Sequence, residues 1–297
     1  MEKELRVKDL NTYFSNWPGF TYDDLYEFYA IEEPELAKSL FNTRVSKLKE
    51  SNVIMVLRSG VYRLVKQSSD SKNAVDSFNG NFMVITADII DSQKHKITPK
   101  ILEGKMEELN ESIKEMRSVL LPFSSSRGDE FQGVTLIGPE IFEMIRNIRY
   151  TFLPVKVRIG LGIGFIEEAN LLYQKNSPSD SWDMSGRAFL NARHALDRLK
   201  DTKKSRVLLH SLHSEGNQTF NLVYRLIDTI VEEWSDKQWE AIQQYNQLQS
   251  YEAGAKAIGI SKSSFYQRCI SAKWDVIRES ENELAHLLVR TFLYNSA

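Results

Sequence analysis

Two short stretches decide the fold of the central part of this chain, Thr86-Ala87-Asp88-Ile89-Ile90-Asp91 and Ser126-Arg127-Gly128-Asp129-Glu130-Phe131-Gln132. The first ends an apolar run that begins at Phe82, and the second lies between two apolar runs. Short apolar runs bounded by turn residues are typical of buried strands, and Gly-Asp between two of them predicts a hairpin. Each stretch therefore places an acidic residue at the end of a strand, where a backbone can hold two carboxylates over one divalent metal ion.

The segments around these stretches alternate between helical and strand-like patterns. We expect strands at 82–87, 123–127, 131–137, 155–164 and 206–210, and helices at 98–120, 139–149 and 186–199. This order predicts an α+β domain over residues 80–230.

Composition limits the class of protein. The 297 residues and 42% hydrophobic content suit two or three compact domains. Lys and Arg number 38 against 40 Asp and Glu, so any basic surface for nucleic acid must be local. The single Cys269 excludes an internal disulfide framework and a cysteine-based zinc site. We therefore expect a cytoplasmic protein, and one without a membrane partner because the sequence has neither a signal-peptide core nor a long apolar run.

Residues 1–66 follow the order helix, helix, basic helix, hairpin, which predicts a winged helix-turn-helix. The third helix is expected over about 33–50 and the hairpin over 53–64. In this interpretation the third helix enters the major groove of DNA and the hairpin meets phosphate. The candidate DNA contacts are Arg44, Lys47, Arg58 and Arg63. An equally open alternative is a solvated charged face on a domain that binds protein, and the polar residues 67–79 read as a linker.

Residues 231–297 contain a second candidate for DNA binding. Tyr251 to Gly259 predicts a short helix of small residues that ends at a glycine, and Ser261 then caps a helix that runs to about Trp274. The expected DNA contacts on and after this second helix are Ser261, Lys262, Ser263, Ser264, Tyr266, Gln267, Arg268 and Lys273. The alternative is a three-helix packing module whose polar face is simply exposed to solvent. The last helix, 274–293, either packs within the chain or forms the seam of a homodimer.

The order of the central elements resembles the ferredoxin-like, palm-type domain shared by class III nucleotide cyclases, GGDEF diguanylate cyclases and polymerase palms. This resemblance implies a site for Mg²⁺ or Mn²⁺ and a nucleoside triphosphate, with Asp88 and Asp129 as metal ligands and Glu130 as an alternate. The candidate nucleotide and phosphate contacts are Lys94, Arg127, Gly128, Asn191 and Arg193.

Two departures from the cyclase pattern bear on catalysis. Asn191 and Arg193 are two residues apart, whereas the matching cyclase pair is four apart, so they cannot share one helical face. The loop before the hairpin also reads Ser125-Ser126-Arg127-Gly128 in place of paired glycines. Both departures weaken a cyclase interpretation.

A narrower resemblance joins three motifs in order. Ala87-Asp88-Ile89-Ile90-Asp91-Ser92, Gly128-Asp129-Glu130-Phe131-Gln132-Gly133 and Gly186-Arg187-Ala188-Phe189, with Ala192-Arg193, are together similar to the SatD family. The resemblance covers about residues 80–290 and implies a C-terminal helix-turn-helix, so the N-terminal winged helix is an addition.

Three functions follow from these observations. The first is a DNA-binding regulator whose palm-like domain senses metal and nucleotide. The second is an active nucleotide cyclase or oligonucleotide synthetase that uses two metal ions. The third is a purely structural palm.

Overall fold

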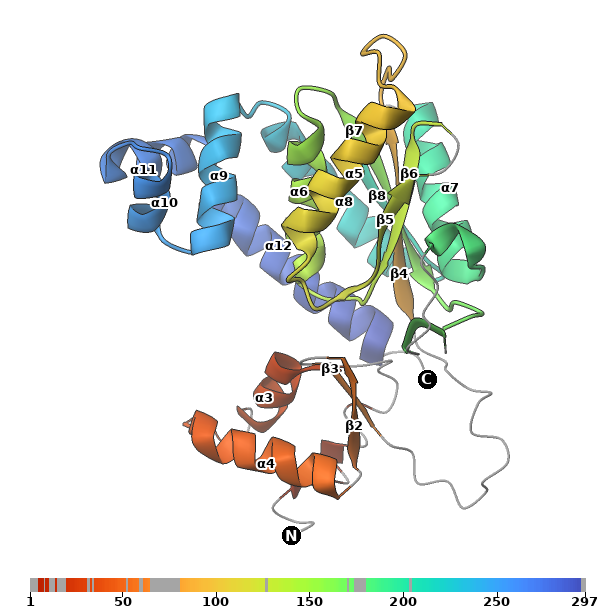
Figure 1. Cartoon of the computed structure of the whole chain (residues 1–297), viewed down its shortest axis with the longest axis vertical. Helices are drawn as coiled ribbons and strands as arrows, with labels where there is room; N and C mark the ends of the chain where they lie inside the picture. Colours follow the sequence, from red (N-terminus) through yellow and green to blue (C-terminus); the bar gives the residue numbers. More distant parts are fainter. Residues whose placement is uncertain are drawn as a thin grey trace.

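The computed structural model describes residues 5–7, 9–10, 14, 20–30, 33, 35–51, 53–58, 61–64, 81–125, 128–169, 171–173, 180–202 and 205–294. The predicted linker and Arg127 lie outside these residues, as do the side chains of Arg58 and Arg63. The chain is a mixed α+β structure with one five-stranded sheet, a smaller N-terminal sheet and a C-terminal group of helices (Figure 1).

The N-terminal segment has its own small sheet and its own core. Its elements are β1 (Phe20–Thr21), α3 (Tyr22–Ala30), α4 (Lys38–Glu50), β2 (Ile54–Arg58) and β3 (Val61–Leu64), and the antiparallel sheet has the order β1-β3-β2. Its core includes Leu25, Phe41 and Ile54. The expected helix over 33–50 begins only at Lys38, because Ala37 has an extended backbone.

The central sheet is built around one fully buried strand. Its strands are β4 (Phe82–Ile89), β5 (Val119–Ser125), β6 (Glu130–Thr135), β7 (Val157–Gly164) and β8 (Val207–His210), in the order β5-β6-β4-β7-β8. Neighbouring strands are antiparallel except for the parallel pair β7 and β8. All residues of β4 are buried, including Asp88, which is the second-last residue of this central strand.

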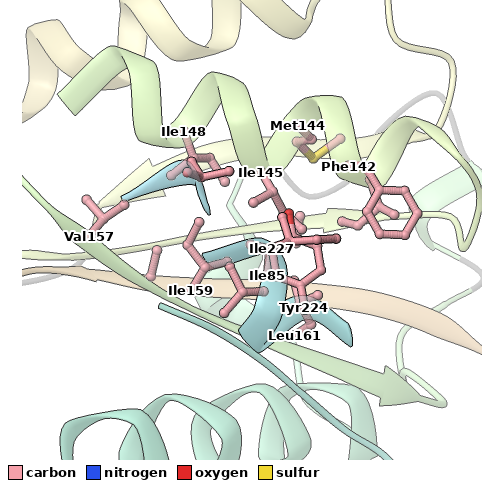
Figure 2. Packing of buried hydrophobic residues seen from close by; sticks show 14 of the residues in the cluster. Ile85, Phe142, Met144, Ile145, Ile148, Val157, Ile159, Leu161, Tyr224 and Ile227 are labelled. Atoms are coloured by element: carbon pink, nitrogen blue, oxygen red, sulfur yellow. The ribbon is translucent and has the colours of Figure 1, made fainter. Parts of the chain in front are cut away.

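Helices cover both faces of this sheet. On one face lie α5 (Pro99–Ile113), α6 (Glu140–Phe152) and α8 (Ser214–Val231), whose apolar side chains share one core with alternate residues of β4 and β7. Figure 2 shows Ile145 and Ile148 of α6 packed towards Val157 and Ile159 of β7. The other face is covered by α7 (Arg187–Thr202) (Figure 1).

A stripe of glycines on β7 sets how closely α7 approaches the sheet. Gly160, Gly162 and Gly164 alternate along the strand, so they lie on one face. A Cβ atom on Gly162 would lie 2.1 Å from the carbonyl oxygen of Ala188 and 2.1 Å from the amide nitrogen of Ala192. Glycine is therefore required there, because the helix backbone fills the space of a side chain.

The predicted helix over 98–120 is too long. The helix ends at Ile113, and β5 starts at Val119, before the strand that we expect at 123. The Glu140 carboxylate accepts hydrogen bonds from the amides of Arg117 (3.3 Å) and Ser118 (2.8 Å), which gives those amides partners outside any helix. The apolar pattern continues past the helix because β5 is itself half-buried.

The C-terminal helices share the core of the central sheet. They are α9 (Asp236–Leu248), α10 (Tyr251–Ala257), α11 (Lys262–Ser271) and α12 (Trp274–Val289), followed by a π-helical turn (Arg290–Tyr294). The buried stripe of α12 includes Ile277, Leu284 and Leu288, and together with Phe292 of the following turn it belongs to the same core cluster as α6 and α8. Packing within the chain is therefore the alternative that the structure shows for this stripe.

Within the described residues, none of the helices is sufficiently long and apolar to cross a membrane.

Candidate functional site

Three charged residues form a row across the central sheet. Asp88 of β4 lies directly opposite Glu130 of β6 on one side and Arg158 of β7 on the other. Directly opposed residues of an antiparallel pair point to the same face, and two like charges in such positions repel each other. The row therefore needs further cations beside the Asp88 and Glu130 carboxylates.

Helix α7 supplies these cations. Lys200 Nζ lies 2.9 Å from Glu130 Oε1 and 3.5 Å from Asp88 Oδ2, so it bridges the two carboxylates. Arg193 donates two hydrogen bonds to Glu130, of 2.8 and 2.7 Å. Arg158 donates from Nη1 to Asp88 Oδ2 at 3.1 Å. The carboxylates of the row are thus neutralised by side chains of β7 and α7.

The two carboxylates differ in their protonation properties. Burial raises the pKa of Asp88, and the nearby Asp129 charge adds to this effect, although Arg158 and Lys200 oppose it. The hydrogen bonds from Arg193 lower the pKa of Glu130, in spite of its partial burial, and the contact with Lys200 acts in the same direction. Paired carboxyls whose environments move their pKa values apart are common at functional sites.

Asp129 lies in the hairpin beside this row. Its carboxylate accepts a hydrogen bond of 2.5 Å from the Ser92 hydroxyl, and its carbonyl oxygen accepts one of 3.3 Å from the amide of Ile89. The turn depends on Gly128, which has φ of 121° and open space around it. This turn brings the Asp129 charge close enough to affect Asp88.

The donor chemistry of these residues suits a hard cation only in part. In the described part of the chain, no three His, Cys, Asp or Glu side chains gather closely enough to hold a metal ion. The predicted ligands Asp88, Asp129 and Glu130 therefore do not converge on one point. Mg²⁺ needs only one or two carboxylates when phosphate oxygens and waters complete its shell, so the residues fit a metal ion that arrives with a phosphate group.

The predicted phosphate contacts have different positions. Arg193 joins the row through Glu130, whereas Asn191 is buried and donates to the carbonyl oxygen of Ile163 at 2.8 Å. Asn191 thus ties α7 to β7, and the two side chains point apart, as their spacing implies. Lys94 is exposed in the turn after β4, and Arg127 lies outside the described residues.

Sequence reasoning missed Lys200 and Arg158. Lys200 follows Arg193 by seven residues, two helical turns, and this spacing places both on one face of α7. That regularity was the available signal for Lys200. For Arg158, the signal was its position at the start of a strand opposite Asp88.

Helices α10 and α11 cross at a very short distance. A Cβ atom on Gly254 would lie 2.4 Å from Cζ of Phe265, and the turn between the helices uses a positive φ of 69° at Gly259. Ser261 caps α11 by accepting a hydrogen bond of 3.1 Å from the amide of Ser264. Small residues in α10 therefore hold α11 at the surface.

The outer face of α11 presents most of the predicted DNA contacts. The exposed residues are Ser261, Lys262, Ser263, Ser264, Tyr266, Gln267 and Lys273. Arg268 is half-buried and donates to Glu240 of α9 at 2.8 Å. Residues 251–273 contain four Lys or Arg and one Glu, a net charge of +3, although the whole chain carries −2. This segment therefore carries a local excess of positive charge.

The predicted contacts of the N-terminal segment are less uniform. Arg44 is buried, donates to both carboxylate oxygens of Glu33 at 2.8 and 3.0 Å, and lies 5.0 Å from the ring centre of Tyr29. These contacts hold α4 inside the domain. Lys47 is half-buried in the last turn of α4.

Comparisons with known proteins identify a family and a distantly similar solved structure. A family model described as the SatD family matches residues 82–288. No curated protein matches the chain. A solved structure titled "Crystal Structure of Regulator of Polyketide Synthase Expression from Bifidobacterium adolescentis" is similar with 11% identity and a TM-score of 0.23, covering 73% of this chain and 82% of that chain. At this TM-score, the likeness adds nothing to the argument on fold or function.

Proposed function

This chain belongs to the SatD family, and we propose that it is a DNA-binding regulator whose α/β domain is a palm-like sensor. In this proposal α11 contacts DNA, and the charged row at the end of β4 receives a nucleotide together with Mg²⁺ or Mn²⁺. The observation that carries the proposal is the exposed, basic face of α11, held at the surface by the close crossing at Gly254.

The crossing of α10 and α11 supports a helix-turn-helix. A short helix, a turn through a glycine and a second exposed helix are the parts of this motif, and the second helix reads the major groove. Ser264 and Gln267 offer hydrogen-bonding groups for base edges, while Lys262 and Lys273 offer charge for phosphates. Arg268 has a protein partner, so we assign it a secondary role.

A salt titration tests the contact with DNA. Each lysine that neutralises a phosphate contributes about −0.9 to the slope of log K against log salt on double-stranded DNA. Lys262→Ala, on α11, should therefore reduce the magnitude of the slope by about one for random-sequence DNA, while Lys100→Ala, at an exposed lysine of α5, should leave it unchanged. Equal slopes for both variants and the wild type would remove α11 from the proposed interface.

The N-terminal segment supports a second contact with DNA. The helices α3 and α4 followed by the antiparallel β2 and β3, with β1 added at the edge of β3, agree with a winged helix. Lys47, Arg58 and Arg63 stay in the proposal as phosphate contacts. We leave Arg44 out, because its guanidinium is engaged with Glu33 inside the domain.

The order of the central elements supports the palm-like interpretation. The run β4-α5-β5-β6-α6-β7, with sheet order β5-β6-β4-β7, is the β-α-β-β-α-β arrangement of ferredoxin-like folds. It places Asp88 at the end of the central strand and Asp129 in the adjacent hairpin, where palm domains hold metal ions. The strand β8 then extends this core at the edge of β7.

The proposed ligand set follows the resemblance to palm-type domains. Asp88 and Asp129 would hold the metal ion, with Glu130 as the alternate, and the ion would supply positive charge to the phosphates. Arg193 and the backbone at Gly128 would contact phosphate oxygens, and Lys94 would add a further charge. We do not extend the proposal to turnover, since Asn191 is committed to the backbone of β7.

Thermal unfolding tests the sensor. A ligand that binds only the folded state raises the unfolding temperature with its concentration. We expect a nucleoside triphosphate with MnCl₂ to raise the unfolding temperature of the wild type and not that of Asp129→Asn. The absence of any shift in the wild type across ATP, GTP, CTP and UTP would reject the sensor and leave the DNA-binding proposal standing.

A further inference from the structure

Lys200 occupies the position between the two carboxylates of the charged row. Its ammonium nitrogen lies 2.9 Å from an oxygen of Glu130 and 3.5 Å from an oxygen of Asp88. A metal ion held by Asp88 together with Glu130, the alternate ligand of the proposed function, would have to lie in the same place. The ammonium group therefore neutralises the charge of the two carboxylates, as a bound metal ion would.

We propose that Lys200 is an internal competitor of the metal ion, so that the site takes up a divalent cation only together with a nucleotide phosphate. This inference rests on the proposed sensor function and specifies its regulation. The site would then respond to the metal–nucleotide complex and not to either component alone.

Charge balance explains the requirement for both components. The side chains of Asp88, Asp129 and Glu130 carry three negative charges, and those of Arg158, Lys200 and Arg193 carry three positive charges. A divalent cation that enters alone must displace the Lys200 ammonium and then lie close to it. Like charges at this separation repel strongly in a half-buried site, so the exchange is unfavourable.

A phosphate group changes this balance. It offers the displaced ammonium a new anionic partner, and its oxygens complete the coordination shell that the two carboxylates leave open. The phosphate therefore reduces the repulsion between the metal ion and Lys200, and the metal ion supplies positive charge for the phosphate. Positive coupling between two ligands is the thermodynamic form of this behaviour.

Lys200 is better suited to move than Arg158, the other cation on Asp88. The side chain of Lys200 is 36% exposed and that of Arg158 is 16% exposed. Arg158 also starts in the neighbouring strand, directly opposite Asp88, so it is fixed by the sheet register. A flexible four-carbon stem from a helix allows the lysine to turn to a phosphate.

Titration of Mn²⁺, followed by its electron paramagnetic resonance signal, tests the inference on the whole chain. For the wild type we expect weak binding of Mn²⁺ alone and affinity at least about tenfold higher in the presence of a nucleoside triphosphate that the thermal screen selects, after correction for Mn²⁺ bound to free nucleotide. For Lys200→Met, which keeps an apolar stem and removes the charge, Mn²⁺ alone should bind about tenfold more tightly than to the wild type. Lys200→Arg should restore the weak binding, and Lys100→Met serves as the matched surface control.

The outcomes separate the inference from the function on which it rests. If the wild type binds Mn²⁺ equally well with and without the triphosphate, Lys200 is not a competitor and only this inference is overturned. If it binds neither Mn²⁺ nor the triphosphate, the sensor function and this inference fail together. Binding of Mn²⁺ alone to Lys200→Met that is no tighter than to the wild type would also overturn this inference, because phosphate ligation by itself couples metal and nucleotide in the wild type. Lys200→Gln takes the place of Lys200→Met if that variant does not fold.

Discussion

The contact between α7 and β7 makes the sharpest prediction about the fold. We expect Gly162→Ala to destabilise the protein strongly, because the new methyl carbon would lie 2.1 Å from backbone atoms of Ala188 and Ala192. Ordinary van der Waals contact begins at 3.4 Å, so the helix must move away from the strand by roughly 1 Å. Backbone atoms of a helix cannot rotate away as the end of a flexible side chain can.

The size of the effect follows from the cost of overpacking. Extra methyl groups in a well-packed interior cost about 1–3 kcal/mol, and occasionally more. Because the obstacle here is backbone, we expect a loss of about 3 kcal/mol in the free energy of unfolding. For a chain of this size, such a loss lowers the unfolding temperature by roughly 6–12 °C.

Gly104→Ala is the matched control for this measurement. Gly104 is exposed in the interior of α5, and nothing lies within 4 Å of an added Cβ. Alanine is the better helix former by about 1 kcal/mol, so the same substitution should stabilise the protein there. Urea unfolding of both variants gives the two free energies. A loss below about 0.5 kcal/mol for Gly162→Ala would refute close packing of α7 on β7.

Three further predictions concern single side chains. Asp228 is buried and accepts hydrogen bonds from Arg149, Ser205 and the amide of Arg206 (2.7 Å), so Asp228→Ala should cost about 3–5 kcal/mol in urea unfolding; a cost below about 1 kcal/mol would contradict this network. The pKa of Glu130 is lowered in the folded state, so its contribution is complete above the unfolded pKa and is lost as the pH falls through the folded value. Stability measured from about pH 5 to about pH 3 should therefore fall less steeply for Glu130→Gln than for the wild type, and equal slopes would show that the pairing contributes nothing. Burial raises the pKa of Cys269 to about 11, so a disulfide reagent at about pH 8 should label this thiol only after unfolding, and rapid labelling of the folded protein would contradict its burial.

The parts of the fold that sequence could predict are those that depend on local signals. Apolar runs predict β4 and β6, and a Gly-Asp pair predicts the turn at Gly128. The structure confirms all three. The end of α5 was predicted too late because the apolar pattern continues into β5, and the amides of Arg117 and Ser118 before that strand pair with Glu140 of another helix. The period of apolar residues cannot predict an element boundary that depends on contacts with residues far away in the sequence.

The candidate site shows the same division more clearly. Asp88 and Asp129 stand out at strand ends, but the link between Asp88 and Lys200 exists only after α7 has packed across β7. Alternate glycines at Gly160 and Gly162 did carry a signal for that approach, because a strand face without side chains admits a helix backbone. The glycines predict that a helix packs closely on this face of β7, but the sequence does not specify which helix does so.

Two charged residues assigned to DNA on sequence grounds have carboxylate partners within the protein. Arg44 and Arg268 each lie on a helix that was expected to contact DNA, and each donates instead to a carboxylate on a neighbouring element, Glu33 and Glu240. A long cation on a helix has several possible partners, and its choice depends on the fold around it. Lys262 and Lys273 are exposed, and the ion pair of Lys262 with Glu252, at 3.6 Å, is open to solvent, so both lysines remain predicted DNA contacts.

Buried ion pairs limit how a signal from the α/β domain can reach α11. Arg146 of α6 pairs with Glu281 of α12 and lies 4.8 Å from the ring centre of Trp274, and Arg149 pairs with Asp228 of α8. Removing one partner of such a buried pair costs about 3–5 kcal/mol, more than a typical allosteric coupling of about 1–3 kcal/mol. A hinge between the sheet and the C-terminal helices at residue 231 would have to break the contacts of Arg146 with Glu281 and Trp274. In the proposed function, a nucleotide bound beside Asp88 would therefore act on DNA binding by moving this whole body, sheet and helices together, relative to a second binding element such as the N-terminal segment.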